Sequence, residues 1–103
     1  MRKAVRDGIH STPAEGWKFS QVGDDEFLKL LLIKLHEEAD EVAEAVQSQD
    51  RVQLMGELAD VISVAGAIAV RFGISSSGIE NAGYSKEEAR GGFYENWVGV
   101  KDV

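Results

Sequence analysis

Residues 25–47, DEFLKLLLIKLHEEADEVAEAVQ, decide the fold, because they contain no glycine or proline and carry apolar residues every three or four positions. That spacing is typical of one face of a helix. The predicted helix has about 22 residues and is about 33 Å long at 1.5 Å per residue. Asp24 or Asp25 is its candidate N-cap. The apolar positions are Phe27, Leu28, Leu31, Leu32, Leu35, Ala39, Val42, Ala43 and Val46.

A second helix is predicted after a short connection at residues 48–50. Asp50 and Gln53 have the spacing of a capping box at its start. Gly73 stands where the residue after a helix end is expected, so we predict that the helix runs to Phe72. A connection of about three residues makes the two helices antiparallel neighbours.

The second half of this helix is apolar on every side. Between Val61 and Val70 the only polar side chain is Ser63. Such helices are enclosed by other helices, and one short chain supplies too few of them. We therefore predict a homo-oligomer, either a dimer or a tetramer, whose bundle core contains Val61–Val70.

The flanking segments differ in their content of helix breakers. Residues 1–23 contain three glycines and a proline, which predicts an irregular arm. Ser77 and Glu80 have capping-box spacing for a third helix that reaches Arg90, with Gly83 as a candidate break. Residues 93–103 are expected to form a short strand or an extended tail. The sequence thus predicts a single all-α domain over residues 1–103, an antiparallel helical bundle made of the arm (1–23), a helix pair (24–73), and a third helix with its tail (77–103).

Composition excludes several classes of protein. Of the 103 residues, 44% are apolar and none is cysteine, so we expect a packed core without disulfides or thiolate metal sites. The net charge of −7 argues against sequence-independent binding to a nucleic-acid polymer or to an anionic membrane. Residues 1–8 are too charged for a secretory signal, and the run 61–70 is about half a membrane span. We expect a cytoplasmic protein without a membrane partner.

The acidity is concentrated on the two central helices. Glu37, Glu38 and Glu41 share one face of the first helix with Lys34, since successive residues are about 100° apart. Glu57 and Asp60 share a face of the second. Five carboxylates on adjacent helices repel one another in a bundle, and a divalent cation neutralises them best.

The ligand types indicate which cation this is. All are oxygen ligands, with no thiolate and no histidine at matching spacing, which favours Mg²⁺, with Mn²⁺ as a second choice, over zinc. The alternative is a solvated acidic face, which is the commoner use of paired glutamates on a helix. It explains Asp40 and Glu44 well. It explains Glu57 and Asp60 poorly, because acidic residues within an apolar run rarely lack a partner.

The same residues resemble a known family. KLHEEADE (34–41), followed by fifteen residues and then ELAD (57–60), resembles the Glu-Glu-x-x-Glu and Glu-x-x-Asp signature of the all-α nucleoside triphosphate pyrophosphohydrolases. This is the MazG-like family, which is related to phosphoribosyl-ATP pyrophosphohydrolase and to the dimeric dUTPases. KAVRD (3–7) resembles the family's N-terminal segment, and Lys86 with RGGF (90–93) resembles its C-terminal one. The chain departs from the pattern at His10 and Ser11, where the family usually has a proline.

The resemblance implies an activity and a set of site residues. Members of the family cleave a nucleoside triphosphate to the monophosphate and pyrophosphate with Mg²⁺. Lys34 either contacts phosphate or pairs with a glutamate. The implied metal ligands are Glu38, Glu41, Glu57 and Asp60; the catalytic carboxylates are Glu37 and Glu38, with Glu37 as a further ligand or the base; and the substrate-binding residues are Lys34, Lys86 and Arg90.

Several functions stay open at this point. The sequence around residues 56–61 and the RGGF segment favour a house-cleaning enzyme that acts on ribo- or deoxyribonucleoside triphosphates. Hydrolysis of phosphoribosyl-ATP in histidine synthesis is the narrower alternative. A helical oligomer that binds metal or nucleotide without turnover is the rival from another class, and a purely structural bundle is the third.

Overall fold

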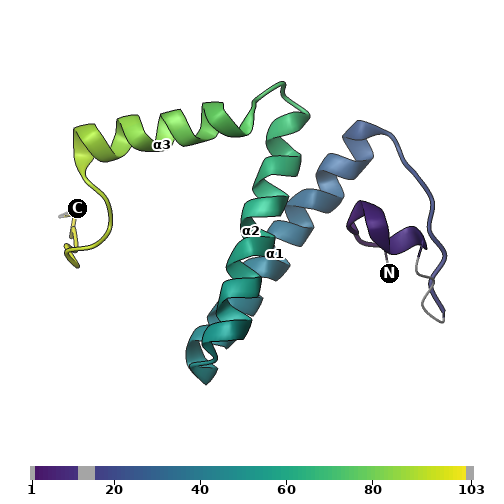
Figure 1. The fold of residues 1–103 in the computed structure, drawn as a ribbon, viewed down its shortest axis with the longest axis horizontal. Coiled ribbons are helices and arrows are strands. Elements are labelled where there is room, and N and C mark those ends of the chain that lie inside the picture. Colours follow the sequence, from purple (N-terminus) through teal and green to yellow (C-terminus); the bar gives the residue numbers. More distant parts are fainter. Residues whose placement is uncertain (1, 12–15, 102–103) are drawn as a thin grey trace. The chain divides into compact units, whose positions relative to one another are not determined.

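The chain is all-helical, as the sequence predicts. A computed structural model describes residues 2–11 and 16–101, and these contain no strand (Figure 1). Two compact units divide the chain, residues 1–73 and residues 74–103. The assignment of all 103 residues to one domain stays a prediction. The elements are η1 (Asp7–Ser11), α1 (Asp24–Ser48), α2 (Arg51–Val70) and α3 (Ser76–Arg90).

Helix α1 agrees with the predicted helix to within one residue at each end, but its N-cap does not. The N-cap is Gly23, in extended conformation and without a side-chain hydrogen bond, so the choice of Asp24 or Asp25 is wrong. Both aspartates lie in the first turn instead, where a negative charge interacts favourably with the helix dipole. The helix stops at Gln49, which adopts a left-handed φ of 57°.

Helix α2 begins as predicted and ends two residues early. The Asp50 side chain accepts a hydrogen bond from the Gln53 backbone N–H at 3.0 Å, which confirms the predicted cap. The last helical residue is Val70 rather than Phe72, because the next three N–H groups bond to carbonyls three residues back. Gly73 then takes a positive φ of 69°, the conformation expected after a helix end.

The helices α1 and α2 form an antiparallel hairpin, and residues 2–11 of the N-terminal arm lie beside it (Figure 1). Ala4 of the arm, Leu31 of α1 and Val64 of α2 are buried together. The arm is not wholly irregular, since η1 forms a short 3-10 helix there. Three elements far apart in sequence therefore share one small core. Partly buried apolar residues pack against it: Phe27, Leu30, Leu35, Ala67 and Ile68.

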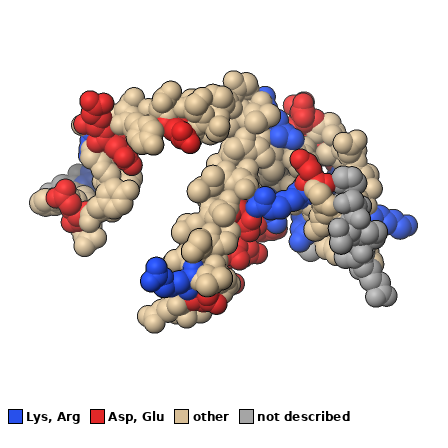
Figure 2. Space-filling view, in the orientation of Figure 1, with Lys and Arg blue, Asp and Glu red and all other residues tan. Residues whose placement is uncertain are grey.

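The opposite side of α2 is uncovered. Its outer stripe (Val52, Met55 and Ile62) is exposed, with Val52 at 80% and Ile62 at 73%. In Figure 2 most of the visible surface of α2 is uncharged, and the charged side chains lie toward its lower end. By length and composition α2 could cross a membrane, a test that the core helix of a soluble protein also passes. The predicted homo-oligomer would cover this stripe, and it stays a prediction.

The second unit consists of α3 and the segment after it. Ser75, not Ser77, caps the helix, since its hydroxyl accepts a hydrogen bond from the Gly78 N–H at 3.1 Å. Gly83 does not break α3, which continues to Arg90 as predicted. Every residue of α3 is exposed within this chain. The described residues of the tail, up to 101, form neither helix nor strand, so of the two predicted alternatives the short strand is wrong there.

Candidate metal centre

Three carboxylates from the two paired helices converge. Glu38 and Glu41 lie one turn apart on α1, and the hairpin brings Glu57 of α2 to face them. One carboxylate oxygen from each of the three lies within 4.8 Å of the others. Oxygen ligands of one Mg²⁺ stand at about 2.1 Å from it, and so up to about 4 Å apart. Small side-chain rotations would thus let all three oxygens bind one ion.

The burial of Glu38 is unusual for an acidic group, whereas Glu41 and Glu57 are more exposed. Glu38 is only 2% exposed, and its Oε1 lies 3.2 Å from the Nζ of Lys34. The second oxygen of Glu38 and the Oε2 of Glu57 are buried without a hydrogen-bond partner. A buried carboxylate oxygen without a partner is costly. A hard divalent ion would satisfy both oxygens, so the residues present fit such an ion.

The carboxylates perturb one another's proton affinity. A hydrogen bond with Glu41, desolvation and the charge of Glu41, followed by a hydrogen bond with Glu38 and its charge, together raise the pKa of Glu57 to about 7. At neutral pH a proton therefore occupies Glu57 in a large fraction of molecules when no metal is bound. A divalent ion binds the charged form and would replace that proton.

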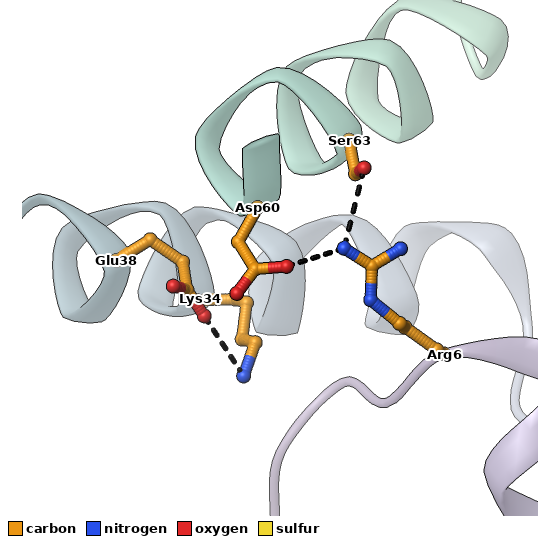
Figure 3. A network of polar contacts seen from close by, with 5 residues as sticks. All are labelled: Arg6, Lys34, Glu38, Asp60 and Ser63. Carbon is orange, nitrogen blue, oxygen red and sulfur yellow. Dashed lines mark hydrogen bonds and ion pairs between the residues drawn. The ribbon is translucent and has the colours of Figure 1, made fainter. Parts of the chain in front are cut away.

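Asp60 lies at the edge of the cluster with a different partner. Its carboxylate forms an ion pair with Arg6 of the arm, and the same Arg6 nitrogen bonds to the Ser63 hydroxyl at 3.3 Å (Figure 3). Within residues 2–11 and 16–101, the group of close carboxylates consists of Glu38, Glu41 and Glu57. Asp60 is not in it, and its role as a fourth ligand stays a prediction.

The other predicted site residues are distributed over both units. Glu37 is half-buried on α1 beside the cluster but outside the group of three. Lys34 pairs with Glu38, which matches one of its two predicted uses. Lys86 and Arg90 are exposed on α3, in the second unit. The roles predicted for Glu37, Lys86 and Arg90 stay predictions.

A groove adjoins the carboxylates. It has a volume of about 870 Å³, and it lies between the arm, α1 and the second half of α2. Glu38 and Asp60 contribute to its wall. Four cationic side chains also line it: Lys3, Arg6, Lys34 and Arg71. A dication bound by the acidic groups, together with these four cationic side chains, would attract the negative charge of a polyphosphate.

The predicted site does not include Arg6, although the structure ties it to Asp60. Two signals in the sequence point toward it. The arm is basic in a strongly acidic protein, and KAVRD (3–7) is one of the segments that resembles the family. Neither signal shows which carboxylate Arg6 meets, because residues 6 and 60 are 54 positions apart.

Comparison with known proteins identifies one family. The family model described as phosphoribosyl-ATP pyrophosphohydrolase matches residues 1–82. The matched range contains the arm, the helix pair and the three close carboxylates, and it ends before Lys86 and Arg90. No curated protein and no solved structure matches the chain.

Proposed function

The chain belongs to the phosphoribosyl-ATP pyrophosphohydrolase family, whose activity is hydrolysis of a phosphorus anhydride, and we propose that it cleaves phosphoribosyl-ATP to the monophosphate and pyrophosphate with Mg²⁺ or Mn²⁺. The motifs in the sequence favour general hydrolysis of nucleoside triphosphates. The family match favours the narrower substrate instead, because it names phosphoribosyl-ATP and covers most of the chain.

The convergence of Glu38, Glu41 and Glu57 is the observation that carries this proposal. These three groups offer oxygen ligands from two helices, and two of their oxygens are buried without a partner. When bound, a divalent ion supplies a more acidic water and stabilises the charge that develops as the anhydride bond breaks. The family membership and the geometry thus support the same chemistry independently.

The protein's own residues have separable tasks in this proposal. Glu38 is held by packing and by Lys34, so that its free oxygen stays oriented without reorganisation. Glu41 and Glu57 complete the ligand set, with Asp60 as a further ligand. Glu37, at the rim, takes a proton from the attacking water or adds a ligand. Lys86 and Arg90 bind the phosphates of the nucleotide.

We also propose a homo-oligomer in the cytoplasm. The exposed outer stripe of α2 supports the oligomer, because an apolar surface of this kind is normally covered by another chain. A second copy offers the same stripe, which makes a symmetric interface possible. The oligomeric state can be measured by analytical ultracentrifugation.

A substrate panel tests the proposed function. Purified protein is incubated with phosphoribosyl-ATP, the four ribonucleoside triphosphates and the four deoxyribonucleoside triphosphates, with Mg²⁺ or with a chelator, and the products are resolved by mass. We expect a monophosphate and pyrophosphate from phosphoribosyl-ATP only when Mg²⁺ is present. Absence of both products from every nucleotide would contradict the proposal and favour a binding protein without turnover.

The house-cleaning enzyme is the second candidate function. The observation in its favour is that the family match ends at residue 82, before Lys86 and RGGF (90–93), the segment that resembles the broader MazG-like family. The same panel separates the two candidates. A kcat/KM for any nucleoside triphosphate of the panel that exceeds the value for phosphoribosyl-ATP would establish the broader function.

A further inference from the structure

The N-terminal arm reaches the candidate metal centre through one side chain. Arg6 contacts Asp60 and Ser63, which lie on successive turns of α2. Both contacts use one terminal nitrogen of the guanidinium, Nη2. A guanidinium has five N–H donors in a planar fork. Among residues 2–11 and 16–101, these side-chain contacts of Arg6 use this one nitrogen, so the guanidinium has further N–H donors with which to bind an acceptor.

The partner of Arg6 is itself placed beside the metal centre. Figure 3 shows the Asp60 carboxylate between Arg6 and Glu38, with one oxygen toward Arg6 and the other on the Glu38 side in this view. Arg6, Asp60, Lys34 and Glu38 all line the same groove. Two of the carboxylates in this wall thus each pair with one cation, Asp60 with Arg6 and Glu38 with Lys34.

The Arg6–Asp60 pair is exchangeable rather than permanent. The side chains are 65% and 37% exposed. Exposed ion pairs contribute little to stability, because water and salt screen them. A divalent ion that binds the Asp60 carboxylate can therefore displace Arg6 from it at little cost in free energy. Arg6 would keep its place in the groove, since Ala4, two residues away, is buried against Leu31 and Val64.

We propose that Arg6 is an exchangeable cation of this site, which pairs with Asp60 until a divalent ion draws that carboxylate and then binds a phosphate oxygen of the substrate. The role of the ion rests on the proposed function. The positive charge of Arg6 opposes the binding of a dication and favours the binding of a polyanion. Removing that charge must therefore change the two affinities in opposite directions, whereas structural damage would weaken both.

Two titrations with Arg6→Gln test this. Mn²⁺ alone is titrated into the protein, and the Mn²⁺–pyrophosphate complex is then titrated into protein saturated with Mn²⁺, both by calorimetry. We expect Mn²⁺ to bind about threefold more tightly to the variant, the effect of one exposed ion pair. We expect Mn²⁺–pyrophosphate to bind about tenfold more weakly, the effect of one charged hydrogen bond.

Arg2→Gln is the matched control. Arg2 lies on the same arm and pairs with Glu26 in the first turn of α1, away from the carboxylate cluster. We expect it to change neither affinity by more than about twofold, in keeping with a screened surface pair. Arg6→Lys keeps the charge and loses the fork, so it should restore the Mn²⁺ affinity of the native protein and only part of the pyrophosphate affinity.

The outcomes separate this proposal from the proposed function. Parallel losses of both affinities in Arg6→Gln, or no change in either, overturn the proposal even if the native protein hydrolyses phosphoribosyl-ATP. Opposite shifts in the two titrations support it even if the native protein hydrolyses no nucleotide, in which case only the enzymatic function fails. Circular dichroism of each variant checks that its helices are intact. If Arg6→Gln is unfolded, Arg6→Lys carries the test through the Mn²⁺–pyrophosphate affinity alone, and an unchanged affinity in that variant overturns the proposal.

Discussion

The carboxylate cluster of the helix pair and helix α3 carry the same kinds of acidic side chain in opposite environments. On α3, Glu80, Glu87 and Glu88 are exposed within the chain, and water can solvate them. In the helix pair, Glu38 is buried and two carboxylate oxygens have no partner. An acidic motif becomes a site only where packing removes water from it, because only there does a bound cation replace a missing hydrogen-bond partner.

The largest effect that separates the two regions is expected on catalysis. Glu38→Gln keeps the shape of the side chain and removes the buried charge, so it should lower kcat/KM for phosphoribosyl-ATP by about 100-fold or more, since even outer-shell partners of a metal site are worth 10–100-fold. Glu87→Gln on α3 is the control and should leave kcat/KM unchanged. Equal activities of the two variants would remove Glu38 from the site. The measurement is a steady-state assay of released pyrophosphate.

The second effect is on stability in the presence of metal. A ligand that binds only the folded state adds about 2.7 kcal/mol at 100 times its Kd, which raises the Tm of a domain this small by about 10–20 °C. We expect this increase with Mn²⁺ for the native protein and for Glu87→Gln, and its loss for Glu38→Gln. Differential scanning fluorimetry with Mn²⁺ and with a chelator gives both values. A full increase in Glu38→Gln would place the ion elsewhere.

A third effect distinguishes the regions by pH. The pKa of Glu57 is about 7 in the folded protein and lower in the unfolded chain, so the folded state binds more protons between these two values. The free energy of unfolding therefore decreases as the pH rises from about 4.5 to about 7 when no metal is bound. Tm measured in chelator across this range should fall. The fall should be smaller for Glu57→Gln and unaltered for Glu80→Gln on α3, and a flat profile for the native protein would contradict the shift.

The smallest effect concerns the cations of α3. If Lys86 and Arg90 bind phosphate as predicted, then Lys86→Ala and Arg90→Ala should each raise KM about 3- to 10-fold, the range of one charged contact partly exposed to water. Tm should not change, because both residues are exposed. An unchanged KM in both variants would show that Lys86 and Arg90 of α3 do not bind the substrate.

Local structure was largely predictable from particular residues. The Asp50 cap, the positive φ of Gly73 after the helix and the end of α3 at Arg90 follow from backbone and side-chain chemistry within a few positions, although α2 ends two residues before the predicted Phe72. The N-caps at Gly23 and Ser75 were not predicted correctly, since neighbouring Asp and Ser residues compete for the same role. The 3-10 helix in the arm was missed because a single short turn has no periodicity to detect.

By itself, the sequence determined that this protein is helical, where its two long helices run, and which residue types could hold a hard cation, because helix periodicity and chemical type are local properties. Only the tertiary structure decided that Glu38, Glu41 and Glu57 form the close group, and that Arg6 holds Asp60. The periodicity of a helix gives the angle of each side chain around its axis. The register of the hairpin and the docking of the arm decide which of those side chains meet, and both depend on packing between residues distant in the chain.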